Sequence, residues 1–424
     1  MLIEENPLAI IADDLTGACD TVGPFGRYGL RAVVTDASRL AWDRAIRILA
    51  VNSDSRKQSG TTVHRQIREI SIQLLKSGRI PFYKKIDSTL KGNWPTELDA
   101  LVSAWFPEVV LVAPAFPIWG RTTQEGIQCL EGRPLSQAKI HHAGRPAGSE
   151  TGRSADVVEI LTRQFGGGVQ LIKRSQLKRG PQWIEKQIES YRFKGNRFLV
   201  FDALSDDDLK SICLGGSRLN LKVLWVGSGG LARFLPLGWG YRLLEGTGAE
   251  DSKPAANATR KPILLVNGSL NPANAEQLEQ LRQNGSVSMI EVDAEDSELN
   301  LLTQTKRAKA LQYLDQGVNL AISFPFNSPI SRSHLQHCHD TLHWLTVSLL
   351  DSTRVGGTII VGGDTAARVY RTTGCSGIEI SGEVQPGIPY GKWIGGLLAD
   401  CPVVTKAGGF GQPDTLVRAL EVVK

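Results

Sequence analysis

The sequence predicts an α/β protein: two α/β domains with mainly parallel sheets. Short apolar runs alternate with amphipathic stretches of helical period along the whole chain. The apolar runs are continuous rather than alternating in polarity, as in strands buried on both faces of a parallel sheet. The chain has 424 residues, which is too long for one ordinary hydrophobic core and favours two domains.

The first half of the chain contains six runs that we expect to form strands. They are residues 8–14, 47–56, 81–88, 109–116, 197–203 and 223–230. Between them, the stretch 61–78 places Ile67, Ile70, Leu74 and Leu75 on one helical face. This rhythm of strand and helix is typical of an α/β fold.

The stretch 246–262, GTGAEDSKPAANATRKP, is small and polar and has no apolar periodicity, so we expect it to be a linker. The first domain then spans residues 1–245 and the second spans 263–424. In the second half the expected strands are 263–269, 288–294, 319–325, 358–364 and 401–411, with a helix near 273–283.

Charge and composition exclude several classes of protein. The net charge of +5 is small for this length, and no aromatic-interleaved basic stripe suggests nucleic-acid binding. No apolar run reaches the roughly 20 residues of a membrane span. The start of the chain does not resemble a signal peptide, and the six cysteines are dispersed without a CxxC motif. We therefore expect a cytoplasmic protein with reduced thiols that binds no nucleic acid and no membrane.

Charged and hydroxyl side chains follow the strands of the first domain. Because the carboxyl ends of parallel strands face the ligand crevice, these side chains are expected to meet in one site. They are Asp13, Asp14, Asp54, Ser55, Arg56, Lys84, Lys85, Asp87, Ser88, Thr89 and Arg121. Arg56 and Lys85 suit an anionic group, Ser88 and Thr89 suit hydroxyls, and an aspartate suits a general base. The alternative is that Asp14 or Asp87 simply caps the following helix.

Glycine and hydroxyl residues follow the strands of the second domain instead. They occur in NGSLNPAN (267–274), GGDTAAR (362–368), GEVQPGIPYG (382–391) and TKAGGFG (405–411). Glycine permits close backbone approach, and N–H groups at a helix start favour anions, so this half suits a nucleotide or another phosphate-rich ligand. Each motif alone is weak, because Gly-Gly turns often merely end strands.

Two further motifs are rejected. PGIPYGKW resembles a P-loop, but its spacing is one residue short and Trp393 stands where Ser or Thr should bind magnesium. SHLQHCHDTLHW gathers His334, His337, His339 and His343 around Cys338. Without a catalytic Glu in H-E-x-x-H spacing, a solvated helix face is favoured over a zinc site.

The order of the motifs along the chain resembles that of the four-carbon acid sugar kinases. The segments are IADDLTGACD, KKIDSTLKGN with ELDA, VAPAFPIWGRTTQEG, GSGGLA, VNGSLNPANAEQ, VGGDTA, GEVQPGIP and TKAGGFG, which together cover about residues 8–420. The resemblance implies a sugar-acid-binding domain followed by a nucleotide-binding domain, with the active site in the cleft between them. It also implies transfer of phosphate from ATP, with Mg²⁺, to the terminal hydroxyl of threonate, erythronate or 3-oxo-tetronate.

The resemblance and the residues at the strand ends together indicate contacts for the two ligands. The acid would contact Asp13, Arg56, Lys85, Ile86, Asp87, Ser88 and Arg121, and the catalytic candidates are Asp13, Asp14 and Asp87. ATP would contact Ser269, Gly362, Gly363, Asp364, Thr365, Gly387, Lys406, Gly408 and Gly409. No metal-binding residue is assigned. The segment 138–161 departs from the family pattern by carrying His141, His142, Arg145 and Arg153, which could alter acid specificity.

Two other functions stay open. A nucleotide-dependent oxidoreductase would use the glycines of the second domain, although no strand-associated G-x-G-x-x-G is present. A non-catalytic sugar-acid sensor would need no Asp13–Asp14 pair. The sequence does not select among the four-carbon acids, and it leaves the oligomeric state open, a homo-oligomer included.

Overall fold

The computed structural model describes residues 6–40, 42–58, 60–138, 154–244, 261–325 and 332–424. They divide into two compact units, unit 1 up to Leu244 and unit 2 from Lys261. Most of the expected linker, residues 246–260, lies outside the described residues. The residues His141, His142, Arg145 and Arg153 also lie outside the described residues. The domain boundaries and the role of the segment 138–161 therefore stay predictions.

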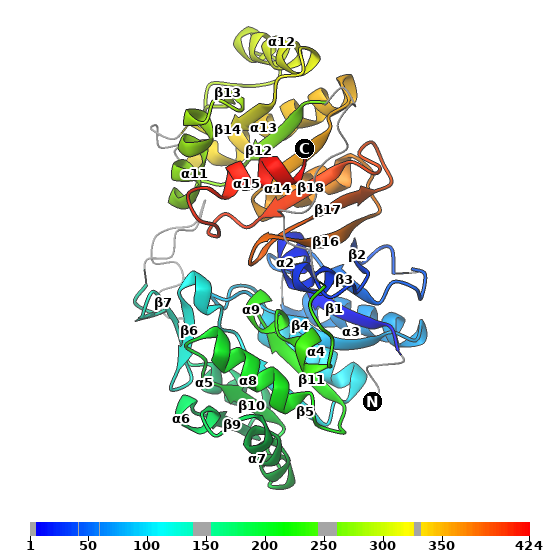
Figure 1. Cartoon of the computed structure of the whole chain (residues 1–424), viewed down its shortest axis with the longest axis vertical. Coiled ribbons are helices and arrows are strands. Elements are labelled where there is room, and N and C mark those ends of the chain that lie inside the picture. The colour runs from blue at the N-terminus through cyan, green and yellow to red at the C-terminus, as the bar shows by residue number, and fades with distance from the viewer. Residues whose placement is uncertain (1–5, 41, 59, 139–153, 245–260, 326–331) are drawn as a thin grey trace. The chain divides into compact units, whose positions relative to one another are not determined.

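Unit 1 is built on a parallel sheet (Figure 1). In spatial order its strands are β2 (Ala32–Asp36), β3 (Ile48–Asn52), β1 (Leu8–Ala12), β4 (Ile80–Lys85), β11 (Val223–Gly227), β5 (Val109–Ala113), β10 (Phe198–Phe201) and β9 (Val169–Ile172). The chain leaves β1 for β2 and β3 on one side and then crosses to β4 on the other. Ligands of doubly wound sheets bind at such a switch point, outside the carboxyl ends of the strands.

Helices cover both faces of this sheet. The longer ones are α2 (Leu15–Gly26), α3 (Gly60–Lys76), α4 (Trp94–Trp105), α5 (Val157–Phe165), α7 (Pro181–Phe193) and α8 (Asp206–Gly216). Short ones are η1 (Pro117–Trp119), α6 (Arg174–Leu177), α9 (Gly229–Ala232) and α10 (Leu235–Gly238). The helix α3 packs on α4, and α4 packs on α5, whereas α2 packs on α9 and α9 on α8.

A small antiparallel sheet accompanies unit 1. It consists of β6 (Arg121–Gln124), β7 (Ile127–Leu130) and β8 (Arg133–Pro134). Bridges from Thr123 to Ala203 and from Ile127 to Asp156 attach it to the segments after β10 and before α5.

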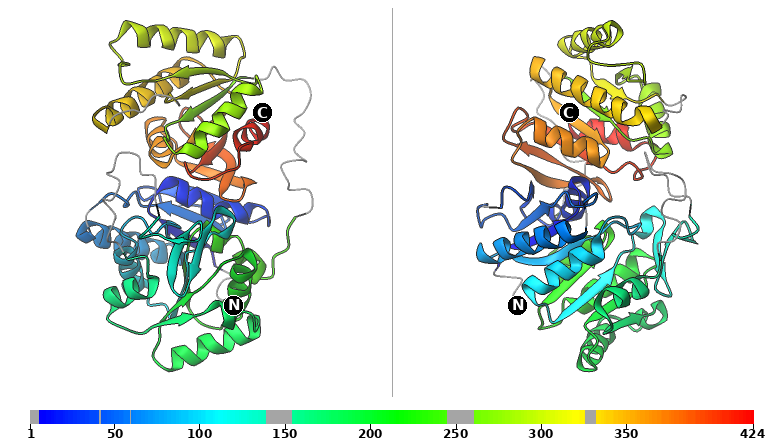
Figure 2. Two further views of the ribbon diagram at one scale, coloured as in Figure 1. Left: turned by 90° about the vertical axis from the view of Figure 1, so that its left-hand side faces the viewer. Right: turned by 180° about the vertical axis from the view of Figure 1, so that it is seen from behind.

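Unit 2 has a mixed sheet (Figures 1 and 2). Its order is β13 (Ser288–Glu291), β14 (Leu320–Ser323), β12 (Ile263–Asn267), β15 (Gly357–Val361), β18 (Pro402–Lys406), β17 (Ile388–Ile394) and β16 (Gly377–Gln385). The first five strands are parallel, β17 runs antiparallel to β18, and β16 pairs antiparallel with β17. The helices are α11 (Pro272–Gln283), α12 (Leu301–Asp315), α13 (Arg332–Ser352), α14 (Gly363–Thr372) and α15 (Thr415–Val422).

Every apolar run that the sequence predicts as a strand contains one, and the helix predicted over 61–78 is α3. Val63, Ile67, Ile70 and Leu74 are buried on its inner face, whereas Leu75 is half-buried. The prediction for the stretch 382–391 is wrong. We expected a glycine loop at a strand end, but these residues form the hairpin β16–β17, whose turn contains Gly387.

No helix within the described ranges is both long and apolar enough to cross a membrane.

The carboxyl end of α8 lies very close to the sheet of unit 1. A Cβ at Gly216 would overlap the Trp225 ring on β11 and would lie 2.7 Å from Leu111 Cδ1 on β5. Both neighbours are fully buried, so neither can move into solvent. Gly216 is therefore required by packing.

We predict that Gly216→Ala destabilises unit 1 by about 1–3 kcal/mol, the usual cost of overfilling a packed core. The measurement is the urea midpoint followed by tryptophan fluorescence. Gly60→Ala at the start of α3 is the matched control, because a Cβ there meets no atom within 4 Å. Equal midpoints for the two variants would contradict the packing argument.

Candidate functional site

Three neighbouring strands of unit 1 end in charged residues at the switch point. Asp13 and Asp14 follow β1, Arg56 follows β3, and Lys85 ends β4, with Asp87 two residues later. Since β3, β1 and β4 are adjacent and parallel, their carboxyl ends bring these residues together. The structure therefore assembles the charged group that the sequence predicts.

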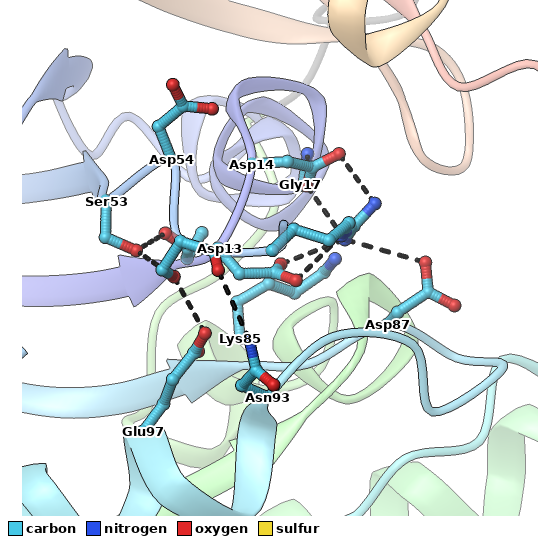
Figure 3. A network of polar contacts seen from close by, with 12 residues as sticks. Asp13, Asp14, Gly17, Ser53, Asp54, Lys85, Asp87, Asn93 and Glu97 are labelled. Carbon is cyan, nitrogen blue, oxygen red and sulfur yellow. Dashed lines mark hydrogen bonds and ion pairs between the residues drawn. The ribbon is translucent and has the colours of Figure 1, made fainter. Parts of the chain in front are cut away.

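Arg56 contacts all three aspartates of this group, Asp13, Asp14 and Asp87, which are labelled in Figure 3. Its Nε and Nη2 donate to the two Asp13 oxygens at 2.7 and 2.9 Å. Its Nη1 and Nη2 donate to Asp14 at 2.9 and 3.1 Å, and Nη2 lies 3.6 Å from Asp87 Oδ2. The guanidinium thus uses most of its donors on the protein's own carboxylates.

Asp14 is also the N-cap of α2. It accepts from the Gly17 amide at 3.0 Å and from the Thr16 hydroxyl at 3.0 Å. The helix-cap alternative is therefore correct for Asp14, which at the same time contacts Arg56. Gly17 is required here, because a Cβ would overlap the Asp14 carboxylate and lie 2.8 Å from Lys85 Nζ.

Burial opposes the ionisation of Asp13 and Asp87, but their cationic neighbours outweigh it. Arg56, with Lys84 and Lys85, holds the pKa of Asp13 below its ordinary value despite burial. Lys91, Arg56 and Lys85 do the same for the pKa of Asp87, and the Thr89 hydroxyl adds a hydrogen bond of 2.5 Å. Both groups are therefore ionised at neutral pH.

A buried polar network lies beneath the charged group. Lys84 Nζ contacts Glu97 Oε2 on α4 at 2.6 Å, and both side chains are fully buried. The other oxygen of Glu97 accepts from Ser55 at 2.7 Å. Ser55 pairs with Ser53, which donates to the Ala12 carbonyl at 2.8 Å. Nothing in the sequence marks Glu97 as part of the site.

Lys85 points to the opposite side of β4 from Lys84, as successive strand residues do. Its ammonium lies 3.6 Å from Asp20 Oδ2 on α2, and both side chains are nearly buried. Burial raises the pKa of Asp20 to about 7, while Lys85 acts in the opposite direction. Asp20 is the last residue of the quoted motif IADDLTGACD, but sequence reasoning gave it no role.

The remaining predicted contacts of the acid surround Lys85 and Asp87. Ile86 is buried and its amide donates to the Gly227 carbonyl at 2.8 Å, while the Ser88 carbonyl accepts from Gln128 at 2.8 Å. Arg121 begins β6, donates to the Trp119 carbonyl and interacts electrostatically with Asp87.

Unit 2 gathers glycines and hydroxyls where β12, β15 and β18 end. A Cβ at Gly268 would overlap Thr365 Oγ1, and a Cβ at Gly408 would overlap Ser269 Oγ. Gly362, the N-cap of α14, has φ +108°, which favours glycine. Backbone and hydroxyl groups thus lie close together, as a phosphate site requires. Gly363 and Asp364 form the first turn of α14, and Gly409 follows Gly408.

Lys406 lies beneath the loop that follows β18 rather than on the surface of this loop. It is fully buried, and its ammonium donates to Asn274 at 2.7 Å and lies 3.2 and 3.5 Å from the Ala407 and Gly408 carbonyls. Burial lowers the pKa of Lys406 to about 7. Its three donors are used within the protein, which supports a role in shaping the loop.

Gly387 lies in the hairpin turn beside the carboxyl end of β18. The antiparallel pairing of Tyr390 with Val404 brings the start of β17 to that end. Gly387 has φ +77°, and its amide donates to Glu383 at 2.7 Å.

The structure offers no ready-made metal centre in the parts of the chain that it describes. No cluster of three or more His, Cys, Asp or Glu side chains there is arranged to hold an ion. The histidine-rich segment forms α13, in which His337 contacts the Asp296 carbonyl and His343 contacts Thr372.

Comparison with known proteins identifies both units. A family model described as a sugar-binding N-terminal domain matches residues 8–235, and one described as a nucleotide-binding C-terminal domain matches residues 264–416. A solved structure from Salmonella typhimurium, titled a putative tRNA synthase, superposes with a TM-score of 0.79 over 99% of both chains at 20% identity. At that identity the likeness shows the fold alone.

Curated relatives match over nearly the whole chain. A D-threonate kinase from Cupriavidus necator is 30% identical over 98% of this chain and 97% of its own, and one from Salmonella typhimurium is 28% identical over 98% of each. A D-erythronate kinase from Heliobacterium modesticaldum is 27% identical over 98% of this chain and 96% of its own. The chain belongs to the four-carbon acid sugar kinase family.

Proposed function

We propose that this kinase transfers the γ-phosphoryl group of ATP to the terminal hydroxyl of a four-carbon sugar acid, with D-threonate as the first candidate. The more similar curated relatives, at 28–30% identity, are named D-threonate kinases, which supports this order of candidates. Erythronate and 3-oxo-tetronate are the alternatives. Because all six cysteines are free, we expect the reaction to take place in the reducing cytosol.

The observation that carries the proposal is the combination of one buried ammonium with several carboxylates at one sheet edge. Lys85 is almost fully buried, and among the described residues its ammonium makes an ion pair but no hydrogen bond. A small anion can use its free donors. Neighbouring carboxylate oxygens can accept hydrogen bonds from hydroxyls. A sugar acid carries both kinds of group.

The three aspartates differ in how many further hydrogen bonds their carboxylate oxygens can accept. Both oxygens of Asp13 and of Asp14 already accept from Arg56. Asp87 Oδ1 accepts from Thr89, but its Oδ2 lies 3.6 Å from Arg56, beyond hydrogen-bond length. We therefore propose that Asp87 orients the attacking hydroxyl and accepts its proton as the new P–O bond forms, while Asp13 holds Arg56 beside it.

The glycine-lined strand ends of unit 2 support binding of the nucleotide phosphates. Gly268, Gly362 and Gly408 leave room that a Cβ would fill, and Ser269 and Thr365 supply hydroxyls there. ATP supplies the phosphoryl group, and Mg²⁺ would neutralise charge on its phosphates. Because Mg²⁺ usually keeps several waters and binds substrate phosphates, no dedicated protein cage is needed. In-line transfer then depends on positioning and charge neutralisation.

The proposal predicts ADP release with D-threonate in a coupled assay, and little release with the other four-carbon acids. ATP, but not NAD, should raise the melting temperature, since a ligand that binds the native state stabilises it. Stabilisation by NAD would favour the oxidoreductase. Binding of an acid without ADP release would favour the sensor.

Asp87→Asn should lower kcat by about 100-fold or more, within the range of general-base contributions, with a smaller effect on KM for the acid. Steady-state kinetics measure the split. Asp207→Asn is the control, because it is the same change on an exposed carboxylate of α8 outside the charged group. If Asp13→Asn alone abolished turnover and Asp87→Asn were nearly normal, the assignment of the two aspartates would be reversed.

Gly408→Ala should raise KM for ATP by about tenfold or more, because the new methyl group would overlap Ser269 Oγ and displace the loop. KM for the acid should change little. Melting temperatures of both proteins show whether the variant remains folded. An unchanged KM for ATP would place the nucleotide elsewhere.

A further inference from the structure

Asp20 and Lys85 form a pair that is separate from the contacts of Arg56. Lys85 Nζ lies 3.6 Å from Asp20 Oδ2, which is an ion pair longer than a hydrogen bond. Their side chains are only 4% and 7% exposed. The two charges are thus close enough to attract each other. Because they share no hydrogen bond, Lys85 can leave Asp20 for an anion that binds it more strongly.

Asp20 has little other support. Thr21 donates to its Oδ1 at 3.0 Å. Gly229 at the start of α9 packs against Asp20 Oδ1. A Cβ added at Gly229 would lie 3.0 Å from this oxygen. Its Oδ2 has Lys85 as its partner. Once Lys85 turns to a ligand, Asp20 keeps a negative charge in a buried place with one hydrogen bond, which is unfavourable.

The surrounding charges add to this cost. On α2, Asp14 repels Asp20, and Asp87 does so from the loop after β4. Lys85 on β4 attracts it, and Tyr83 on the same strand also faces it. The carboxylates of Asp14 and Asp87 and the ammonium of Lys85 therefore act on Asp20, which faces one more negative charge than positive charges. An anionic acid adds another.

We propose that Asp20 is a positioning residue that holds Lys85 in the free protein and takes up one proton when an anionic substrate binds Lys85. The inference rests on the proposed function, because the four-carbon acid supplies the anion. The proton comes from the buffer through solvent and ends on an Asp20 oxygen, so binding converts one carboxylate and one buffer acid into a carboxyl group and the buffer's base.

The direction of the pH effect follows from burial. In the free protein the pKa of Asp20 is about 7. Loss of Lys85 and arrival of a second anion both raise it in the complex. Below pH 7 the carboxyl is already protonated, so binding needs no proton. Above pH 7 each complex must take one up, and affinity falls as pH rises.

Calorimetric titration of the whole chain with D-threonate tests this coupling. Performed in two buffers of different ionisation enthalpy, it gives the number of protons taken up. We expect nearly one at pH 8 and nearly none at pH 6, with Kd rising up to about tenfold per pH unit above 7. An infrared difference spectrum should show a new protonated carboxyl band on binding.

Asp20→Asn should remove the proton uptake, the infrared band and the pH dependence of Kd. Asp207→Asn, a matched change on an exposed carboxylate of α8, should keep all three signals. If Asp20→Asn does not fold, binding of D-threonate to the unchanged protein without proton uptake still contradicts the role of Asp20.

The possible results separate the two ideas. If D-threonate is bound and phosphorylated without proton uptake, or if uptake persists in Asp20→Asn, the role of Asp20 is wrong and the proposed function stands. If no four-carbon acid binds or is phosphorylated, the proposed function fails, and this inference fails with it.

Discussion

The buried ion pair between Lys84 and Glu97 fixes the arrangement on which the proposed acid site depends. Two fully buried charges at 2.6 Å are costly to desolvate, and removing one partner of such a pair is typically strongly destabilising. The pair does more than join β4 to α4. Through Ser55 and Ser53 it reaches the carbonyl of Ala12, so it holds the residues that directly precede Arg56 and Asp13, and Lys84 itself precedes Lys85.

This scaffold explains why the site combines rigid and available groups. Arg56 is held by Asp13 and Asp14, and Asp14 is held in addition by the start of α2. Lys85 and one oxygen of Asp87 have weaker contacts and can exchange them for a ligand. In unit 2 the buried Lys406 supports the loop that contains Gly408, and its side chain also lies in the interior rather than on the surface. In both units the buried charges position the groups that we propose to meet the ligands.

The fold class and most strands could be predicted from the sequence, because a strand buried on both faces leaves a continuous apolar run such as residues 109–116. The strand β9 has a largely half-buried surface and leaves a weaker signal. The hairpin β16–β17 was misread because its glycines resemble loop glycines. Asp13, Arg56 and Lys85 could be found because each lies at a strand end. Glu97 and Asp20 lie on helices, where nothing local in the sequence distinguishes a buried carboxylate from an exposed one.

The place of β11 in unit 1 has a consequence for the synthesis of the chain. The strand lies between β4 and β5, yet it follows β5 by more than a hundred residues. Until it emerges from the ribosome, β4 and β5 cannot pair with their final neighbour, and each presents an open edge of backbone donors and acceptors. Such edges and the non-local pairing that closes them slow folding and expose a nascent chain to aggregation. The surroundings of Tyr83 and Asp20, which contact Ser228 and Gly229, are completed by this late insertion.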